Sequence, residues 1–351
     1  MSQSNNDASS AGTTSIAVLG AGSWGTALAV QFARAGSNVK LWGRDSEMVS
    51  QMKQSRVNHQ YLPDAAFPDS LSAEPDWNAC LADADIVLVS VPSHGFRTVV
   101  QRLADDSVFD INKVGICWAT KGLEISSGLL PHQVLKTVVA DHQQYAVLSG
   151  PTFAKEVGLD LPTAITVAAS NESYGKTLCN SLCSDRFMAY SSNDVIGVEV
   201  GGAVKNVLAI GAGMSDGLGF GANARVALIN RGLRELSRLG IAMGANPDTF
   251  MGLAGMGDLV LTCTDNLSRN RRMGMALAAG ATIEQAAEEI QQVVEGVSAA
   301  KAVFEKAAAL DVSMPITEQI YRVLHERKPV QDAVRDLLNR ANGRDTDDIY
   351  P

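Results

Sequence analysis

A lysine and an asparagine interrupt an apolar run in the second half of the chain, and they are candidates for proton chemistry. The run reads GGAVKNVLAI over residues 201–210, with Lys205 and Asn206 at its centre. A buried ammonium group is costly unless it is paired, and burial lowers its pKa toward the range in which proton transfer is useful. The alternative is a lysine that reaches solvent from a half-buried helix. These residues alone leave both interpretations open.

A possible partner for this lysine lies about fifty residues further on. Asp258 follows three glycines in the apolar segment GLAGMGDLVLTCT, and Thr262 and the block SRNRRMG (268–274) come shortly after it. One acid and several arginines in a mostly uncharged region suit a small phosphorylated substrate. The alternatives for the arginines are a solvated face or an RNA patch. The net charge of −9 disfavours RNA.

A glycine-rich turn near the N-terminus indicates a different kind of binding. In SIAVLGAGSWGTALA, the residues Gly20, Gly22 and Gly25 lie between a β-prone run at 16–19 and a helical pattern that starts at Thr26. A strand, then G-x-G-x-x-G, then a helix is the context that holds a dinucleotide pyrophosphate on the N–H groups of the helix N-terminus. A glycine turn without a ligand is the alternative.

Further candidates follow apolar runs that we predict as strands. These runs are residues 37–42, 84–92, 114–120, 144–150 and 163–169, and residues 186–192 could add an edge strand. Ligands of doubly wound sheets bind outside the carboxyl ends of parallel strands. We therefore expect Lys121 to face the cofactor or an anionic substrate rather than to be a surface lysine. Gly150 and Thr152 lie at the next strand end, where a turn made only for folding is the alternative.

The residues after the second predicted strand bear on the choice of cofactor. Arg44 is placed to pair with the 2′-phosphate of NADP, and Asp45 could instead hold the ribose of NAD. Two solvated loop charges are the remaining alternative. We favour NADP, with NAD tolerated.

The order of these elements predicts two domains of different class. Predicted strands alternate with helices, such as residues 95–103 and 128–140, through the first half, which indicates an α/β doubly wound domain. From about residue 200 the spacing is helical throughout, which predicts an all-α domain. We therefore expect a disordered tail at 1–14, a Rossmann-type dinucleotide-binding domain at 15–199, a helical substrate domain at 200–341 and a loose tail at 342–351.

Composition limits the remaining function classes. The 351 residues are 46% hydrophobic and 19% charged, which suits a packed globular protein, and none of the apolar runs reaches the ~18 residues expected of a membrane span. The first 14 residues lack the basic start and apolar core of a signal peptide, so we expect the cytoplasm. The five cysteines are expected to be reduced structural thiols, and the five histidines have no metal-ligand spacing. GMSDG (213–217) follows a helical pattern rather than the strand that a nucleophile elbow needs.

The motifs together resemble one family. GAGSWGTALA, KG, SGPTFAKEV, GGAVKNVLAI, GLAGMGDLVLTCT, SRNRRMG and VEGV follow, in this order, the pattern of the bacterial-type NAD(P)-dependent glycerol-3-phosphate dehydrogenases, from about residue 16 to residue 325. The resemblance implies reversible reduction of dihydroxyacetone phosphate to sn-glycerol 3-phosphate, which feeds phospholipid synthesis. It also implies an active site in the cleft between a Rossmann domain and a helical domain, a possible homodimer, and no metal.

The resemblance also assigns residues to roles. Lys205 would donate a proton to the substrate carbonyl and accept it back in the reverse reaction. The positions implied to contact substrate are Lys121, Gly150, Thr152, Lys205, Asp258, Ser268, Arg269 and Asn270. Those implied to contact the cofactor are Gly20, Gly22, Ser23, Trp24, Gly25, Arg44, Tyr61, Lys121, Ala154, Arg269, Val293 and Glu295. Trp24 would cover the cofactor, with helix–sheet packing as the alternative.

Two other functions remain open from the sequence. A 3-hydroxyacid dehydrogenase of similar architecture would also use a helix lysine, but it would carry a carboxylate site where this chain has SRNRRMG. A non-catalytic NADP sensor would keep the glycine loop without needing Lys205, Asp258 and Arg269 together. Replacing Lys205 by Ala distinguishes an enzyme, which loses turnover, from a sensor.

Overall fold

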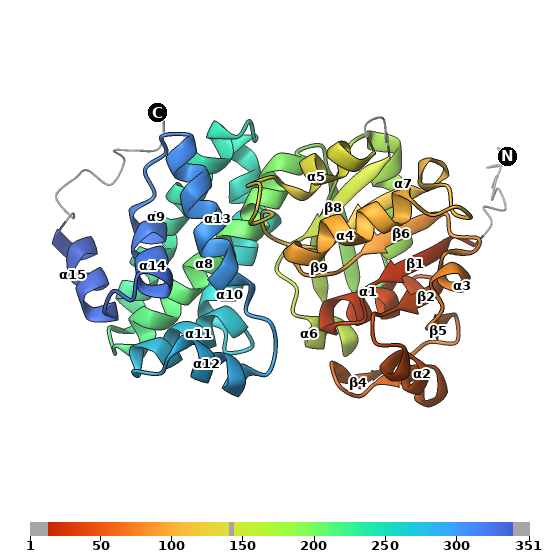
Figure 1. Ribbon diagram of the computed structural model, residues 1–351, viewed down its shortest axis with the longest axis horizontal. Helices are drawn as coiled ribbons and strands as arrows, with labels where there is room; N and C mark the ends of the chain where they lie inside the picture. Colours follow the sequence, from red (N-terminus) through yellow and green to blue (C-terminus); the bar gives the residue numbers. More distant parts are fainter. Residues whose placement is uncertain (1–12, 140–143, 340–351) are drawn as a thin grey trace, which may run out of the picture.

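The computed structural model of the chain describes residues 13–139 and 144–339. Two halves lie side by side along the long axis, one built on a sheet and the other from helices (Figure 1). The predicted tail at 342–351, most of the predicted tail at 1–14 and the last residue of the helix predicted at 128–140 lie outside the described residues.

The first half is built on one eight-stranded sheet. Its strands lie in the order β10-β9-β8-β7-β6-β1-β2-β5. In chain order they are β1 (Ser15–Leu19), β2 (Asn38–Trp42), β5 (Leu71–Ala73), β6 (Ile86–Val89), β7 (Gly115–Trp118), β8 (Tyr145–Ser149), β9 (Thr163–Ala169) and β10 (Phe187–Ser192). β1 pairs in parallel with β2 on one side and with β6 on the other. The chain therefore reverses its direction across the sheet at β1, which is where doubly wound folds bind ligands.

Helices cover both faces of this sheet (Figure 1). α1 (Ser23–Arg34) and α7 (Glu172–Leu182) pack on one face, where Phe32 and Leu178 belong to one hydrophobic core. α4 (Ser93–Ala104) and α5 (Pro131–Val138) pack on the other face, where Phe96 and Leu135 belong to a second core. The short α2 (Ser46–Ser55), α3 (Trp77–Leu81) and α6 (Ala154–Gly158) complete this half. The predicted α/β doubly wound class is confirmed.

One pair of strands runs differently from the parallel series that we expected. β8 and β9 are antiparallel, with Ala146 opposite Ala169 and Ser149 opposite Thr166. The connection from β8 to β9 spans residues 150–162 and contains only the five-residue helix α6, which at about 1.5 Å per residue is too short to run back along the length of a strand, as the helix of a parallel crossover does. The predicted edge strand is confirmed, because β10 lies at the edge and pairs in parallel with β9. The short hairpin of β3 (Val57–Asn58) and β4 (Leu62–Ala66) was not predicted.

The second half is all helical in the residues that the structure describes. Its helices are α8 (Val195–Gly217), α9 (Gly221–Ala242), α10 (Asp258–Thr264), α11 (Arg269–Ala278), α12 (Ile283–Ile290), α13 (Glu295–Ala309), α14 (Pro315–His325) and α15 (Val330–Asn339). α8 is the central helix, and α9, α10, α11, α13 and α14 pack around it. Within the described ranges it is the one helix long and apolar enough to cross a membrane, contrary to our reading of the apolar runs, and 94% of its apolar window is buried inside the protein. It is therefore a core helix.

α8 belongs to both halves of the molecule. Val195 and Val198, in its first turn, lie in the core on the α4 and α5 side of the sheet. From Val200 to Met214 its apolar residues lie in the core of the helical half. The boundary that we predict between residues 199 and 200 therefore falls inside one continuous helix.

Glycines bring α8 and α11 into backbone contact. A Cβ atom on Gly213 of α8 would lie 2.0 Å from the carbonyl oxygen of Arg271, and one on Gly274 of α11 would lie 2.0 Å from that of Ile210. No larger residue fits at either position without moving a helix. The distance between packed helices depends on the side chains at their contact, so these glycines set how close α11 approaches α8.

Candidate active site

Two lysines and one aspartate meet where the sheet half and the helical half join. Lys121 follows β7 by three residues, Lys205 lies within α8, and Asp258 is the first residue of α10. The Lys205 Nζ donates to Asp258 Oδ1, and it donates to Thr262 Oγ1 at 3.1 Å. The Lys121 Nζ donates to Asp258 Oδ2 at 2.8 Å. One carboxylate thus faces two ammonium groups, which leaves a net positive charge in the cluster.

Burial and charge set the protonation of this cluster. Lys205 is 7% exposed and Asp258 is 1% exposed. The alternative interpretation, a lysine that reaches solvent from a half-buried helix, is therefore wrong. The pKa of Lys205 is lowered to about 8, mainly by burial and in part by Lys121, while Asp258 opposes the change. Burial acts to raise the pKa of Asp258, but the two ammonium groups hold it below its ordinary value. A lysine of this kind exchanges a proton near neutral pH beside a carboxylate that stays ionised.

The glycines before Asp258 let its segment lie against α8. They form a π-helical turn, Leu253–Gly257. A Cβ on Gly201 of α8 would lie 2.4 Å from the carbonyl oxygen of Ala254, and one on Gly255 would lie 2.3 Å from that of Phe250. The close approach of this turn to α8 carries the Asp258 side chain to Lys205.

The glycine loop has the geometry that a dinucleotide requires. Gly20 has φ +127°, and a Cβ there would lie 2.1 Å from the carbonyl oxygen of Ser90. A Cβ on Gly25 would lie 1.9 Å from the carbonyl oxygen of Gly20, whereas one on Gly22 would meet nothing within 4 Å. The first and third glycines therefore serve packing, and the second leaves space beside the chain. α1 begins there with no side-chain cap and no acidic residue in its first turn, so its N–H groups suit a phosphate.

Trp24 has the packing role that was one of its two predicted roles. Its indole packs against the hydrophobic core on the α1 side of the sheet, and its buried Nε1 has no hydrogen-bond partner among the described residues. The adjacent Ser23 is the first residue of α1.

The two charged candidates after β2 differ in their surroundings. The Asp45 Oδ1 accepts the Met48 N–H at 3.0 Å and caps α2, so this carboxylate already has a structural role. Arg44 is exposed and forms no ion pair within the part of the chain that the structure describes. The arginine is thus the candidate left available to a ligand.

A buried asparagine that the sequence analysis missed ties the Tyr61 segment to the glycine loop. The Asn58 Nδ2 donates to the carbonyl oxygen of Ala21 at 3.0 Å and to Thr26 Oγ1 at 2.8 Å. Its Oδ1 accepts the Tyr61 N–H at 3.1 Å. The structure thereby brings Tyr61 toward the loop. Ala154, at the start of α6, packs against the same core as Trp24.

The turn after β8 lies beside the lysine and aspartate cluster. Ser149, the last residue of β8, donates its Oγ to Asp258 Oδ2 at 3.4 Å. Gly150 is buried, and the Thr152 Oγ1 donates to its carbonyl oxygen at 3.2 Å. Ser149 was not among our predicted site residues, although it directly precedes two of them.

Amide groups connect three helices next to Lys205. The Asn206 Oδ1 accepts from Asn270 Nδ2 at 2.9 Å, and the Asn206 Nδ2 donates to Glu295 Oε2 at 3.2 Å. The Gly296 N–H donates to Asn270 Oδ1 at 2.9 Å. The first turns of α11 and α13 are thereby joined to the lysine-bearing part of α8.

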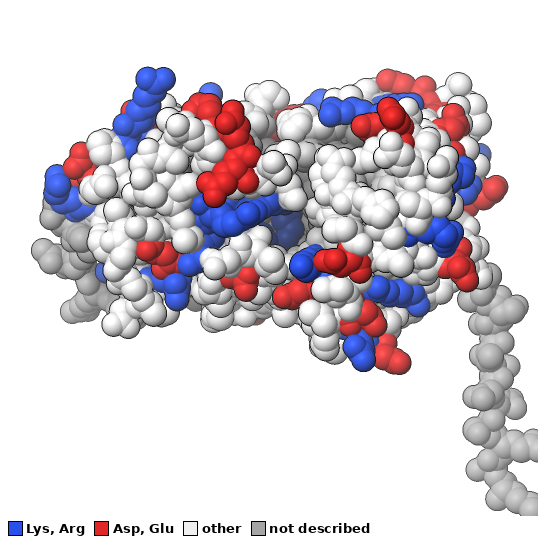
Figure 2. Space-filling model, turned by 90° about the horizontal axis from the view of Figure 1, so that it is seen from below, with Lys and Arg blue, Asp and Glu red and all other residues white. Residues whose placement is uncertain are grey.

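The remaining predicted residues of the helical half lie at the same helix ends. Ser268 caps α11 by accepting the Arg271 N–H at 3.2 Å. Arg269 is half-buried and has no ion-pair partner in the described ranges, and Val293 is exposed just before α13. Figure 2 shows Lys and Arg side chains gathered around and inside a hollow between the two halves. An anionic ligand would find a basic site there despite the acidic chain.

A second carboxylate that the sequence analysis missed joins the two halves behind this cluster. The Glu199 Oε1 accepts from Trp118 Nε1 at 3.0 Å and from the His132 N–H at 2.9 Å, and its Oε2 lies 2.5 Å from His132 Nδ1. Burial raises the pKa of Glu199, although the His132 hydrogen bonds oppose the change. An acid inside the apolar run before Lys205 was the sequence signal for this residue.

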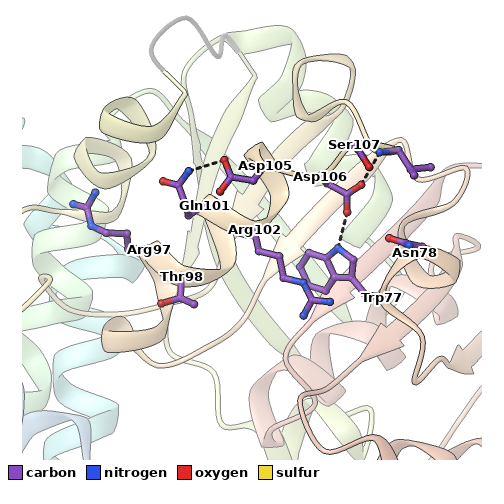
Figure 3. A pocket seen from close by; sticks show the side chains of 10 residues that line it. Trp77, Asn78, Arg97, Thr98, Gln101, Arg102, Asp105, Asp106 and Ser107 are labelled. Carbon is purple, nitrogen blue, oxygen red and sulfur yellow. Dashed lines mark hydrogen bonds between the residues drawn. The ribbon is translucent and has the colours of Figure 1, made fainter.

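An open groove of about 750 Å³ lies elsewhere, along the outer side of α4, and contains none of the predicted residues (Figure 3). There the guanidinium of Arg102 lies 3.9 Å from the Trp77 ring centroid, and the Trp77 Nε1 donates to Asp106 Oδ2 at 2.9 Å. In the same groove the Gln101 Nε2 donates to Asp105 Oδ1 at 2.9 Å.

The doubly wound sheet, the glycine loop at its switch point and the buried lysine and aspartate cluster define a two-domain dinucleotide-dependent oxidoreductase. Comparison with known proteins gives the family. The model of the NAD-dependent glycerol-3-phosphate dehydrogenase N-terminus matches residues 15–175, and the model of its C-terminus matches residues 194–335. The chain belongs to the NAD-dependent glycerol-3-phosphate dehydrogenase family.

Individual relatives agree with this assignment. The chain is 50% identical to a glycerol-3-phosphate dehydrogenase [NAD(P)+] of Vibrio cholerae over 341 residues, which cover 97% of this chain and 98% of the relative. It is 53% identical to the enzyme of that name from Yersinia pestis over 327 residues, which cover 93% and 96%. The crystal structure of glycerol-3-phosphate dehydrogenase from Coxiella burnetii, 46% identical, superposes with a TM-score of 0.89 over 93% of this chain and 99% of that one.

Proposed function

We propose that this chain catalyses the reversible reduction of dihydroxyacetone phosphate to sn-glycerol 3-phosphate, with Lys205 as the proton donor and acceptor. The observation that carries the proposal is the buried Lys205, which is paired with Asp258 and whose pKa is lowered to about 8. The relatives at about half identity carry the name of this activity. The product would feed phospholipid synthesis.

The lysine and aspartate cluster performs the proton chemistry in this proposal. The Lys205 Nζ gives a proton to the carbonyl oxygen during reduction and takes it back during oxidation. Asp258 holds the ammonium group in place, and Lys121 adds positive charge where the oxygen becomes negative. When bound, the nicotinamide cofactor supplies the hydride.

The substrate is held from both halves of the molecule. We assign its hydroxyl and phosphate ends to Asp258 and to Ser268, Arg269 and Asn270 at the start of α11. Lys121 after β7 and Gly150 and Thr152 after β8 would make further contacts with the substrate. Arg269, which has no ion-pair partner among residues 13–139 and 144–339, and the N–H groups of the α11 N-terminus support the phosphate assignment.

Residues at the carboxyl edge of the sheet would hold the cofactor. Gly22 leaves space for its phosphates, and the N–H groups of Ser23 and Trp24 at the α1 N-terminus suit them. We assign further contacts to Gly20, Gly25, Tyr61, Lys121, Ala154, Arg269, Val293 and Glu295. NADP is favoured over NAD because Arg44 forms no ion pair with any described residue, whereas Asp45 caps α2. Replacing Arg44 by Ala should raise the KM for NADPH about tenfold, as expected for loss of a charged hydrogen bond, and leave the KM for NADH nearly unchanged.

We further propose the arrangement of the whole chain. Residues 15–199 would form the dinucleotide-binding domain and residues 200–341 the substrate domain, with α8 shared between them. The protein would act in the cytoplasm, and a homodimer is consistent with this family assignment.

The test mixes the protein with dihydroxyacetone phosphate and NADPH or NADH and follows the absorbance of the reduced cofactor at 340 nm. The wild-type protein should oxidise the cofactor, and Lys205→Ala should lose turnover by about 10²–10⁴-fold while it binds NADPH normally. The matched control is Lys176→Ala, an exposed lysine on α7. Activity only on 3-hydroxyacids, or NADPH binding without turnover, would overturn the proposal in favour of the two alternatives.

A further inference from the structure

A buried ion pair lies directly beside the residues that we assign to the substrate phosphate. Arg271 follows Asn270 on α11, yet its guanidinium contacts α8. The Arg271 Nε and Nη2 donate to Asp216 Oδ2 at 3.0 and 2.6 Å, and both side chains are 8% exposed. The Arg271 Nη1 also donates to Asn266 Oδ1, in the loop that leads into α11.

A second arginine shares the same carboxylate. The Arg225 Nη1 of α9 donates to both oxygens of Asp216, at 2.9 and 3.0 Å. Asp216 is therefore the acceptor that joins α8, α9 and α11. Since Arg225 pairs with Asp216 independently, removal of Arg271 would leave a balanced pair rather than a bare buried charge.

The ion pair lies next to the backbone contact between α8 and α11. The carbonyl oxygen of Arg271 is the atom that a Cβ on Gly213 would strike, and Gly274 makes the reciprocal approach to Ile210. Helices in such contact pack with the ridges of one in the grooves of the other, which restricts the positions that α11 can take along α8. The glycines permit a close contact, and the ion pair selects where along α8 the first turn of α11 stays.

We propose that Asp216 and Arg271 are positioning residues for substrate recognition. They fix the first turn of α11 on α8, so that Ser268, Arg269 and Asn270 are held for the phosphate while Lys205 serves the carbonyl from the same helix. This inference rests on the proposed function, in particular on the assignment of those three residues to the phosphate. It predicts that the pair governs recognition of the phosphate and has little effect on the proton transfer.

The experiment compares dihydroxyacetone phosphate with dihydroxyacetone, which lacks the phosphate, in Arg271→Met and Arg271→Lys. Arg271→Met should raise the KM for dihydroxyacetone phosphate about tenfold or more, with kcat changed by less than about threefold. Its kcat/KM for dihydroxyacetone should stay within about twofold of wild type. Arg271→Lys keeps the charge but not the fork of donors, so it should recover part of the KM.

The control and the outcomes separate this inference from the proposed function. Arg322→Met removes an ion pair with Glu318 on α14 and should change neither KM. If wild type fails to reduce dihydroxyacetone phosphate, the proposed function and this inference both fail. If wild type is active but Arg271→Met keeps its KM, or loses kcat/KM equally on both substrates, the positioning role alone is overturned. Should Arg271→Met not fold, Arg271→Lys carries the same comparison.

Discussion

Replacing Asp258 by Asn should destabilise the protein in a pH-dependent way. The change keeps the shape of the side chain but leaves Lys121 and Lys205 facing each other without a counter-charge. Removing one partner of a buried ion pair typically costs about 3–5 kcal/mol. The folded variant relieves the repulsion by releasing the Lys205 proton, since burial and Lys121 both lower its pKa and no carboxylate then opposes them.

The sign of the pH dependence follows from the Lys205 pKa. An unfolded lysine keeps its proton up to about pH 10.5, so between the folded and unfolded pKa values the unfolded state binds more protons and stability rises with pH. Each pH unit in this window adds about 1.4 kcal/mol. The free energy of unfolding of the variant rises throughout the range from pH 7 to 9. That of wild type, in which the folded pKa of Lys205 is about 8, rises mainly above pH 8. The deficit of the variant should therefore narrow by about 1.4 kcal/mol between pH 7 and 9.

Urea unfolding followed by circular dichroism at pH 7 and pH 9 measures this deficit. Asp248→Asn, an exposed carboxylate in the same half of the protein, is the control and should show a small deficit at both pH values. The double variant Asp258→Asn/Lys205→Met should recover stability at pH 7. A deficit that is constant or grows with pH would refute the assignment of the cluster as one carboxylate shared by two ammonium groups.

Three further predictions test other parts of the structure. Gly25→Ala should fold poorly because its Cβ would lie 1.9 Å from a carbonyl oxygen, whereas Gly22→Ala should keep the wild-type melting temperature and weaken NADPH binding. Thermal unfolding measures the stability of the two variants, and a fluorescence titration measures their NADPH binding. Equal behaviour of the two variants would contradict the separate roles of these glycines. Burial raises the pKa of Glu235 to about 7, so wild type should lose up to about 3 kcal/mol of stability as pH rises from 4.5 through 7, and Glu235→Gln should flatten this loss in urea unfolding between pH 5 and 8. Cys183 is the exposed cysteine and the other four are buried, so a thiol reagent should modify one site rapidly in the native protein, and Cys183→Ser should abolish that fast reaction.

The arrangement of the sheet was largely predictable because buried parallel strands are apolar on both faces. The runs that became β6 and β7 carry almost no polar residue, and their positions follow from composition alone. The direction of β9 was not predictable in this way, because direction depends on whether the connection crosses the sheet. β3 and β5 have two and three residues, which is too short for alternation to be visible, and the five residues of β4 (LPDAA) contain a proline and an aspartate and do not alternate.

The candidate site was predictable as separate residues but not as a cluster from spacing alone. Lys205 and Asp258 were conspicuous because each is a charge within an apolar segment. Their contact joins positions 53 residues apart, and that of Lys121 with Asp258 joins positions 137 residues apart. Such contacts depend on tertiary packing. Asn58 was missed for the same reason, because its side chain binds the carbonyl oxygen of Ala21 in the glycine loop, 37 residues away in the sequence.

The sharing of α8 between the two halves has a consequence for how the protein unfolds. The first turn of the helix completes the core of the sheet half, and Glu199 anchors it to Trp118 and His132, while the rest forms the centre of the helical half. Neither half can lose its structure without removing a packing surface from the other. We therefore expect the two domains to melt in a single cooperative transition, so that a cavity made far from Lys205 in either core also lowers the population of the active enzyme.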